Sequence, residues 1–128
     1  MKRIVSSLFV LLTLGATAYA ASSVNVSGNW VGVNYTSQVQ GPSEVKLHLS
    51  QAGENIAGSY WAATGVAGNG KGSMTGVNTF HIDWVNTTKS CPGTYSNDYI
   101  INGNQITWTF TGKDCLGVEQ GHGYATRK

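Results

Sequence analysis

The segment EVKLHLSQAGENIAGSYW, residues 44–61, carries the clearest structural signal in the sequence. Apolar and polar side chains alternate over residues 44–51, which is the period of a β-strand with one buried face. The turn-forming sequence AGEN follows at residues 52–55, and residues 56–61 alternate again. Together these features predict an antiparallel β-hairpin.

The same alternation recurs on both sides of this hairpin. Further strands are expected at residues 30–36, 71–75, 79–85, 91–101, 105–112 and 118–127, with a bulge inside 91–101. Residues 38–43 are expected to connect two strands, and the Gly-rich residues 62–70 to form a flexible loop or a weak strand edge. No segment has the 3.6-residue periodicity of an amphipathic helix, so the sequence predicts an all-β fold.

About eight strands joined in sequence order by short turns predict an antiparallel up-and-down meander. Each strand has one apolar face, so the sheet must curl to bury that face. A closed barrel of eight strands achieves this. A β-sandwich of the same size is the structural alternative.

Residues 1–20 have the features of a secretory signal peptide. Lys2 and Arg3 precede an apolar stretch, and the small residues Ala18 and Ala20 predict cleavage after about Ala20. The stretch is shorter than the roughly 20 apolar residues that a membrane-spanning helix needs. We therefore expect residues 21–128 to form a single domain that is periplasmic or secreted, with no membrane span.

The charge balance of the exported part excludes several classes of partner. Loss of Lys2 and Arg3 leaves six of the eight basic residues against six acidic ones, so the formal charge becomes zero. Binding to nucleic acid or to an anionic membrane surface requires a basic surface. Neither partner is expected.

Cys91 and Cys115 are the two cysteines of the chain. In an exported protein an even pair predicts one disulfide. Closing this loop would stabilise the fold by about 3.5 kcal/mol if the effect comes from the entropy of the unfolded chain. Free thiols or a two-cysteine metal site fit an oxidising compartment less well.

Gly28-Asn29-Trp30 at the first strand and Arg127 in the last strand frame the meander. In this combination the chain resembles the calycin superfamily, which includes lipocalins, fatty-acid-binding proteins and avidins. The resemblance implies that Trp30 plugs one end of the barrel. It also implies that Arg127 lies across the indole ring, a cation–π contact worth about 0.5–2 kcal/mol.

The chain departs from these families in two respects, because it has neither the C-terminal helix of lipocalins nor the Trp-rich biotin wall of avidins. It is also similar in layout to small periplasmic protease inhibitors of bacteria. Those proteins have a short barrel, one disulfide and a free N-terminal segment, which residues 21–24 would provide here.

Five aromatic side chains on inward strand faces are candidates for lining an apolar ligand cavity: Tyr60, Phe80, Trp84, Trp108 and Phe110. The alternative is that these rings simply fill the core. An eight-stranded barrel has room either for side chains or for one small ligand, and the size of the rings favours a filled interior.

The three histidines give no catalytic or metal-binding pattern. His81 and Asp83 share one strand face, but two ligands do not make a metal site. No serine stands in the Gly-x-Ser-x-Gly context of a hydrolase nucleophile. The sequence therefore predicts no catalytic residue, no metal and no cofactor.

The resulting hypothesis is an exported binding protein without enzyme activity, whose partner is a small apolar molecule. The alternative is an inhibitor or interaction module that binds a cell-envelope or extracellular protein through its loops and its N-terminus.

Overall fold

The computed structural model describes residues 24–128, which form one closed barrel of eight antiparallel strands. Residues 1–23, and with them the predicted signal peptide and cleavage site, lie outside the described residues. The strands are β1 (Gly28–Thr36), β2 (Val39–Ala52), β3 (Asn55–Ala62), β4 (Ala67–Met74), β5 (Thr79–Asn86), β6 (Gly93–Asn102), β7 (Gln105–Asp114) and β8 (Gly117–Arg127). No helix long and apolar enough to cross a membrane occurs in this part of the chain.

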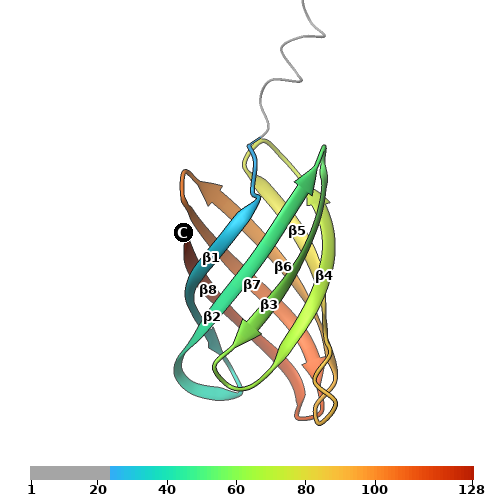
Figure 1. Ribbon diagram of the computed structural model, residues 1–128. Coiled ribbons are helices and arrows are strands. Elements are labelled where there is room, and N and C mark those ends of the chain that lie inside the picture. Colours follow the sequence, from blue (N-terminus) through green and yellow to red (C-terminus); the bar gives the residue numbers. More distant parts are fainter. Residues whose placement is uncertain (1–23) are drawn as a thin grey trace, which may run out of the picture.

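The barrel is an up-and-down meander, as the short turns predict. Each strand pairs with its neighbours in sequence, and β1 closes the ring by pairing with β8 from Trp30–Arg127 to Thr36–Gly121. Figure 1 shows the strands inclined to the barrel axis and wrapped into one continuous wall. The β-sandwich alternative is therefore wrong.

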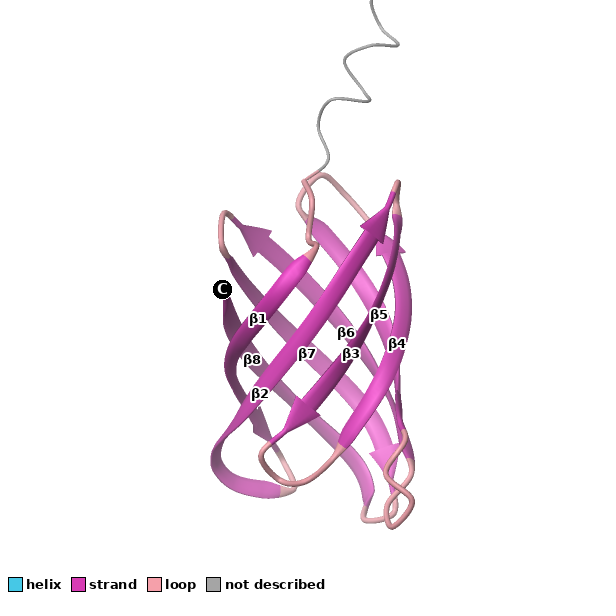
Figure 2. Ribbon diagram, viewed as in Figure 1, coloured by secondary structure: helices cyan, strands magenta, loops and turns pink. Residues whose placement is uncertain are grey.

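The two ends of the barrel differ. The segment Val24–Ser27 and the turns β2–β3, β4–β5 and β6–β7 lie at one end, shown at the top of Figure 2, where the described chain enters. The connections β1–β2, β3–β4, β5–β6 and β7–β8 lie at the opposite end. We call these the plugged end and the open end.

The plugged end is filled by apolar side chains around Trp30, which is fully buried. The indole N–H of Trp30 donates to the carbonyl oxygen of Val26 at 3.0 Å, and the backbone N–H of Val26 donates to Oε1 of Gln51 at 2.8 Å. Val26 is itself fully buried, so residues 24–27 form part of the plug. Val24, the last residue of the segment expected to be free, packs against this core, and residues 21–23 lie outside the described residues.

Arg127 covers the plugged end by lying over the ring of Trp30. Its guanidinium carbon lies 4.6 Å from the centroid of the Trp30 ring. One of its nitrogens, Nη1, donates to the carbonyl oxygens of Asn25 and Ser27 at 2.9 and 2.8 Å. The last strand is thereby fastened to the segment that precedes the first.

Glycine occupies several inward positions of two strands, Gly68, Gly70 and Gly72 in β4 and Gly121 and Gly123 in β8. A Cβ atom on Gly70 would lie 2.5 Å from the ring of Trp84. The missing side chains therefore make room for aromatic rings of neighbouring strands, since a core cannot hold both.

Most strands differ from their predicted bounds by one or two residues, and three differ in a way that has a structural reason. β4 begins at Ala67, inside the stretch expected to be a loop, and β6 runs without the expected bulge. β2 begins at Val39 rather than Glu44, because a bulge opposite Tyr35 absorbs the Gly41-Pro42 pair. Gly41 adopts a φ of 79° there, a conformation that glycine tolerates.

Candidate functional site

The open half of the barrel contains a cavity of about 390 Å³. Its walls come from the inward side chains of seven strands, β4 being excepted, and from the connections at the open end. The expectation of a filled interior therefore holds only for the half around Trp30. The open half of the barrel contains the cavity instead.

Four of the five predicted residues line this cavity: Tyr60, Trp84, Trp108 and Phe110. Phe80 does not. It is 1% exposed and lies opposite Tyr99 in the pairing of β5 with β6, where the two rings stack with centroids 4.5 Å apart and planes 2° from parallel. Phe80 supports the wall from within the core, and its assignment as a lining residue needs correction.

The aromatic walls are held in fixed orientations by contacts between rings. Tyr60 meets Trp84 edge to face with centroids 5.2 Å apart, and Tyr99 meets Trp108 at 5.5 Å. Such pairs stabilise a fold by about 0.5–1.5 kcal/mol beyond the area they bury. The cavity is therefore preformed.

Hydrogen bonds fix both indole rings. Nε1 of Trp84 donates to the hydroxyl of Tyr99 at 2.9 Å, and Nε1 of Trp108 donates to Oδ1 of Asn34 at 2.9 Å. The Tyr99 hydroxyl also accepts from Nδ2 of Asn97 at 3.2 Å. Both indole N–H groups are thus already used by the protein.

Two polar atoms at the cavity have no hydrogen-bond partner in the described structure, the hydroxyl of Tyr60 and Oδ1 of Asn97. Asn97 is only 8% exposed, so its unpaired atom lies well inside the barrel. Buried polar groups are almost always hydrogen-bonded, because leaving one unpaired costs about 1–3 kcal/mol. These atoms are where a ligand would gain polar contacts.

Two carboxyl groups also line the cavity. Glu119 is 8% exposed, and burial raises the pKa of its carboxyl group, an effect reinforced by Asp114 and opposed by a hydrogen bond with Thr36. Burial likewise raises the pKa of Tyr95, to about 12, with Asp114 and Glu119 adding to the rise. Acidic side chains are therefore concentrated on this side of the cavity.

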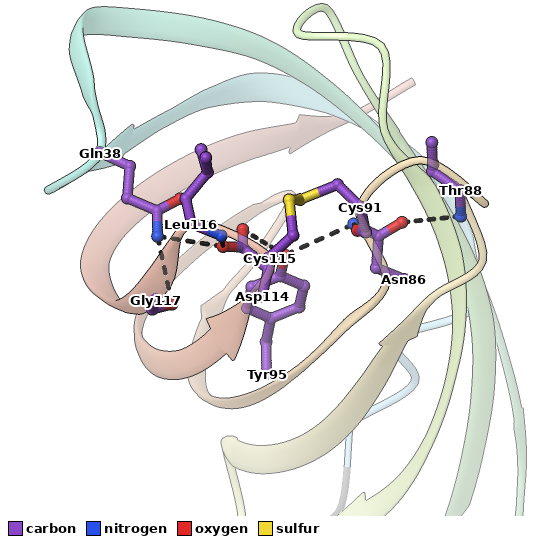
Figure 3. The surroundings of a disulfide bond; sticks show 9 residues. All are labelled: Gln38, Asn86, Thr88, Cys91, Tyr95, Asp114, Cys115, Leu116 and Gly117. Atoms are coloured by element: carbon purple, nitrogen blue, oxygen red, sulfur yellow. Dashed lines mark hydrogen bonds between the residues drawn. A yellow bond between two sulfur atoms is a disulfide. The ribbon is translucent and has the colours of Figure 1, made fainter.

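Asp114 is held in place by several donors, which Figure 3 shows. Its Oδ1 accepts from Nε2 of Gln38 at 3.1 Å and from the backbone N–H of Leu116 at 2.9 Å. Its Oδ2 accepts from the hydroxyl of Tyr95 at 3.1 Å. The carboxylate thus joins the β1–β2 and β7–β8 connections to the cavity wall.

The predicted disulfide between Cys91 and Cys115 is present and lies at the rim of the cavity. It ties the β5–β6 connection to the β7–β8 connection, as Figure 3 shows. Asn86 adds to this brace, because its Nδ2 donates to the carbonyl oxygen of Cys91 at 2.9 Å. The two sulfur atoms are bonded to each other, so their closeness to Asp114 does not form a metal site.

The polar part of the site was not among the residues predicted from the sequence. Asn97 and Glu119 were not predicted, although the period of two that marks the strands extends to both. Counting back from Ile101 places Asn97 on the inward face of β6, and counting back from Ala125 does the same for Glu119 on β8. A polar residue at an inward position of a strand is the sequence feature that could have identified both.

A second polar cluster lies on the outer face of β5 and β6. Nδ1 of His81 lies 2.7 Å from Oδ1 of Asp98, its Nε2 lies 2.8 Å from Oδ1 of Asp83, and Oγ of Ser96 lies 3.3 Å from the same Nε2. The hydrogen bond with Asp98, followed by that with Asp83, raises the pKa of His81. Both ring nitrogens of His81 therefore face carboxylate oxygens, an arrangement that favours the protonated ring, and Nε2 is shared between Asp83 and Ser96.

Comparisons with known proteins give a structural likeness alone. No protein-family model and no curated protein matches the chain. Among solved structures it is similar to a redesigned β-barrel, mFAP0, bound to DFHBI. The TM-score is 0.62 at 16% sequence identity, and the match covers 79% of this chain and 97% of the other. At this identity the likeness supports the barrel fold alone.

Proposed function

We propose that this chain is an exported binding protein, without enzyme activity, that holds a small and largely apolar molecule in the open half of its barrel. One observation carries the proposal, the preformed cavity of about 390 Å³ that Tyr60, Trp84, Trp108 and Phe110 line. Ligand pockets span roughly 300–1,000 Å³ and are mostly apolar with a few placed polar groups.

Two further observations support this proposal. The barrel mFAP0, which is similar to this chain, was solved with DFHBI bound, so a barrel of this fold can hold a small molecule. The disulfide between Cys91 and Cys115 suits an oxidising compartment, as expected for an exported chain. The Ser96–His81–Asp98 arrangement differs from a hydrolase triad. Both ring nitrogens of His81 lie against carboxylates, whereas a triad leaves one nitrogen to the nucleophile.

A second candidate function has one observation in its favour. Leu116, on the connection that the disulfide braces, and Val118, at the start of β8, are 73% and 77% exposed. Rigid loops that display apolar side chains are typical of protein-binding surfaces. The chain would then bind a cell-envelope or extracellular protein through this rim.

Native mass spectrometry of the protein purified from its own organism would separate the two functions. An added mass of a few hundred daltons that is lost on mild denaturation would support a ligand-carrying barrel. A mass shift that equals a second polypeptide would support the rim as a protein-binding surface.

A binding titration with a defined probe complements this experiment. N-phenyl-1-naphthylamine is neutral, apolar and fluorescent in apolar surroundings, and we expect it to bind the purified barrel. Val45→Phe should abolish the signal, because Val45 is 5% exposed and lines the cavity. Val85→Phe makes the same change at an outward position that is 51% exposed and serves as the control. Equal loss in both variants, or retention in Val45→Phe, would contradict binding inside the barrel.

A further inference from the structure

We infer that the cavity selects molecules that carry a positive charge, namely an amine on an apolar or aromatic body, over neutral and anionic molecules of the same shape. This inference rests on the proposed binding function and specifies the class of its ligand.

The charges at the cavity are all of one sign. Among the described residues that line it, Asp114 and Glu119 are acidic, and none is a lysine, an arginine or a histidine. Charges interact more strongly inside a protein than in water, because the local dielectric constant is low. An anionic ligand such as a fatty acid would therefore be repelled, and an ammonium group would be attracted.

Glu119 has a hydrogen bond with Thr36, but among the described residues it has no basic side chain as an ion-pair partner. The ion pairs found within residues 24–128 both belong to His81 on the outer face, so neither involves Glu119. The titratable group that acts on the pKa of Glu119 is Asp114, which is acidic, and Glu119 in turn raises the pKa values of Tyr60 and Tyr95. Buried charges in proteins are paired or bind a cation. An ammonium group in the cavity would fill this role.

The walls favour the same charge. The rings of Tyr60, Trp84 and Trp108 line the cavity, and the negative face of an aromatic ring attracts a cation within about 6 Å. An anion would instead need N–H donors. The indole N–H groups of Trp84 and Trp108 cannot serve, because they already donate to Tyr99 and Asn34. The cavity thus offers more to an amine than to a carboxylate.

Asn97 provides an independent sign that a polar ligand belongs here. The side chain is more than nine-tenths buried, lines the cavity and has an oxygen without a partner. Since an amide can turn by half a rotation, Asn97 can accept from a ligand or donate to one. The carboxyl groups set the preferred charge, and Asn97 supplies a further polar contact.

Three probes that share a naphthalene body test the inference by isothermal titration calorimetry. At neutral pH, 1-naphthylmethylamine is a cation, 1-naphthalenemethanol is neutral and 1-naphthoate is an anion. We expect the amine to bind about tenfold more tightly than the alcohol, equivalent to about 1.4 kcal/mol, and the carboxylate to bind most weakly. Acidification should weaken binding of the amine but not of the alcohol, because protonation of Glu119 removes its charge.

Glu119→Gln keeps the shape of the side chain and removes its charge. It should reduce the preference for the amine over the alcohol to about twofold or less while the alcohol still binds. Glu44→Gln makes the same change at an exposed position on β2, outside the lining, and should leave the preference intact. Circular dichroism would verify that both variants fold.

The outcomes separate the two proposals. If the alcohol or the carboxylate binds wild-type protein as tightly as the amine, the charge preference is wrong and the binding function stands. Retention of the full preference in Glu119→Gln would also overturn it. If none of the three probes binds and the protein from its own organism carries no small molecule, the binding function itself fails.

Discussion

Gly123 on β8 lies so close to Trp108 on β7 that a Cβ atom there would be 2.4 Å from Cζ2 of the indole ring. The same atom would lie 2.6 Å from the carbonyl oxygen of Val33. The position of the Trp108 ring, and with it one wall of the cavity, thus depends on the absence of a side chain on the neighbouring strand.

Gly123→Ala should therefore lower the free energy of unfolding by about 1–3 kcal/mol, the usual cost of overpacking a core. Urea denaturation followed by tryptophan fluorescence would measure this. In a double-mutant cycle with Trp108→Leu, part of the loss should be recovered, because the smaller side chain vacates the contact. Strictly additive effects would mean that the ring and the glycine do not interact.

Arg127→Ala should lower the free energy of unfolding by about 2 kcal/mol, because it removes the cation–π contact with Trp30 and the hydrogen bonds to Asn25 and Ser27. Arg127→Lys should recover less than half of this, since a single ammonium group cannot replace the guanidinium fork. Lys128→Ala, at the adjacent exposed position, is the control in the same urea titration. A full recovery by lysine would show that charge alone matters.

Replacing both Cys91 and Cys115 by serine should destabilise the barrel by about 3.5 kcal/mol, if the disulfide acts by restricting the unfolded chain. Thermal unfolding of this variant should match that of the wild type treated with dithiothreitol. The disulfide lies at the rim, so the plugged end should keep its structure. Loss of hydrogen-exchange protection around Trp30 would contradict this expectation.

The His81 cluster should make stability depend on pH in one direction. The pKa of His81 is higher in the folded protein than its usual 6.5, so its contribution is complete below that value and is lost as pH rises through the folded-state pKa. The side chains of Asp83 and Asp98 are 73% and 75% exposed, which limits the effect to about 1 kcal/mol or less.

Urea titrations between acidic and alkaline pH would measure this contribution. It is the difference in free energy of unfolding between wild type and Asp98→Asn. Asp98 makes the largest contribution to the shift, so the difference should be large just below pH 6.5 and should vanish as pH rises through the folded-state pKa of His81. A difference that stays constant with pH would assign Asp98 a purely structural role.

The strands that could be predicted from sequence are those whose inward side chains are large. Leu47 and Leu49 in β2, and Trp108 and Phe110 in β7, give an alternation that fixes both the strand and its buried face. The start of β4 could not be found in this way. Its inward positions are glycines, and the space they leave is filled by rings from other strands, which no local pattern records.

The candidate site likewise has one part that a local sequence pattern predicts and one part that it does not. Its aromatic walls could be predicted, because ring-bearing residues alternate along β5 and β7. Whether those rings fill the interior depends on how the inward rows of all eight strands fit together, which only the assembled barrel determines. Phe80 and Trp84 belong to the same inward row of β5, yet one lies in the core and the other in the cavity wall.

The pairing of β1 with β8 has a consequence for how the molecule forms. Seven of the eight strand pairs join neighbours in sequence, and each can assemble as a local hairpin. Closure alone brings together residues as distant as Trp30 and Arg127. During synthesis from the N-terminus, the ring therefore cannot close until Gly117–Arg127 has been made. Until then the polypeptide is an open ribbon, and its slowest folding step should be this long-range closure.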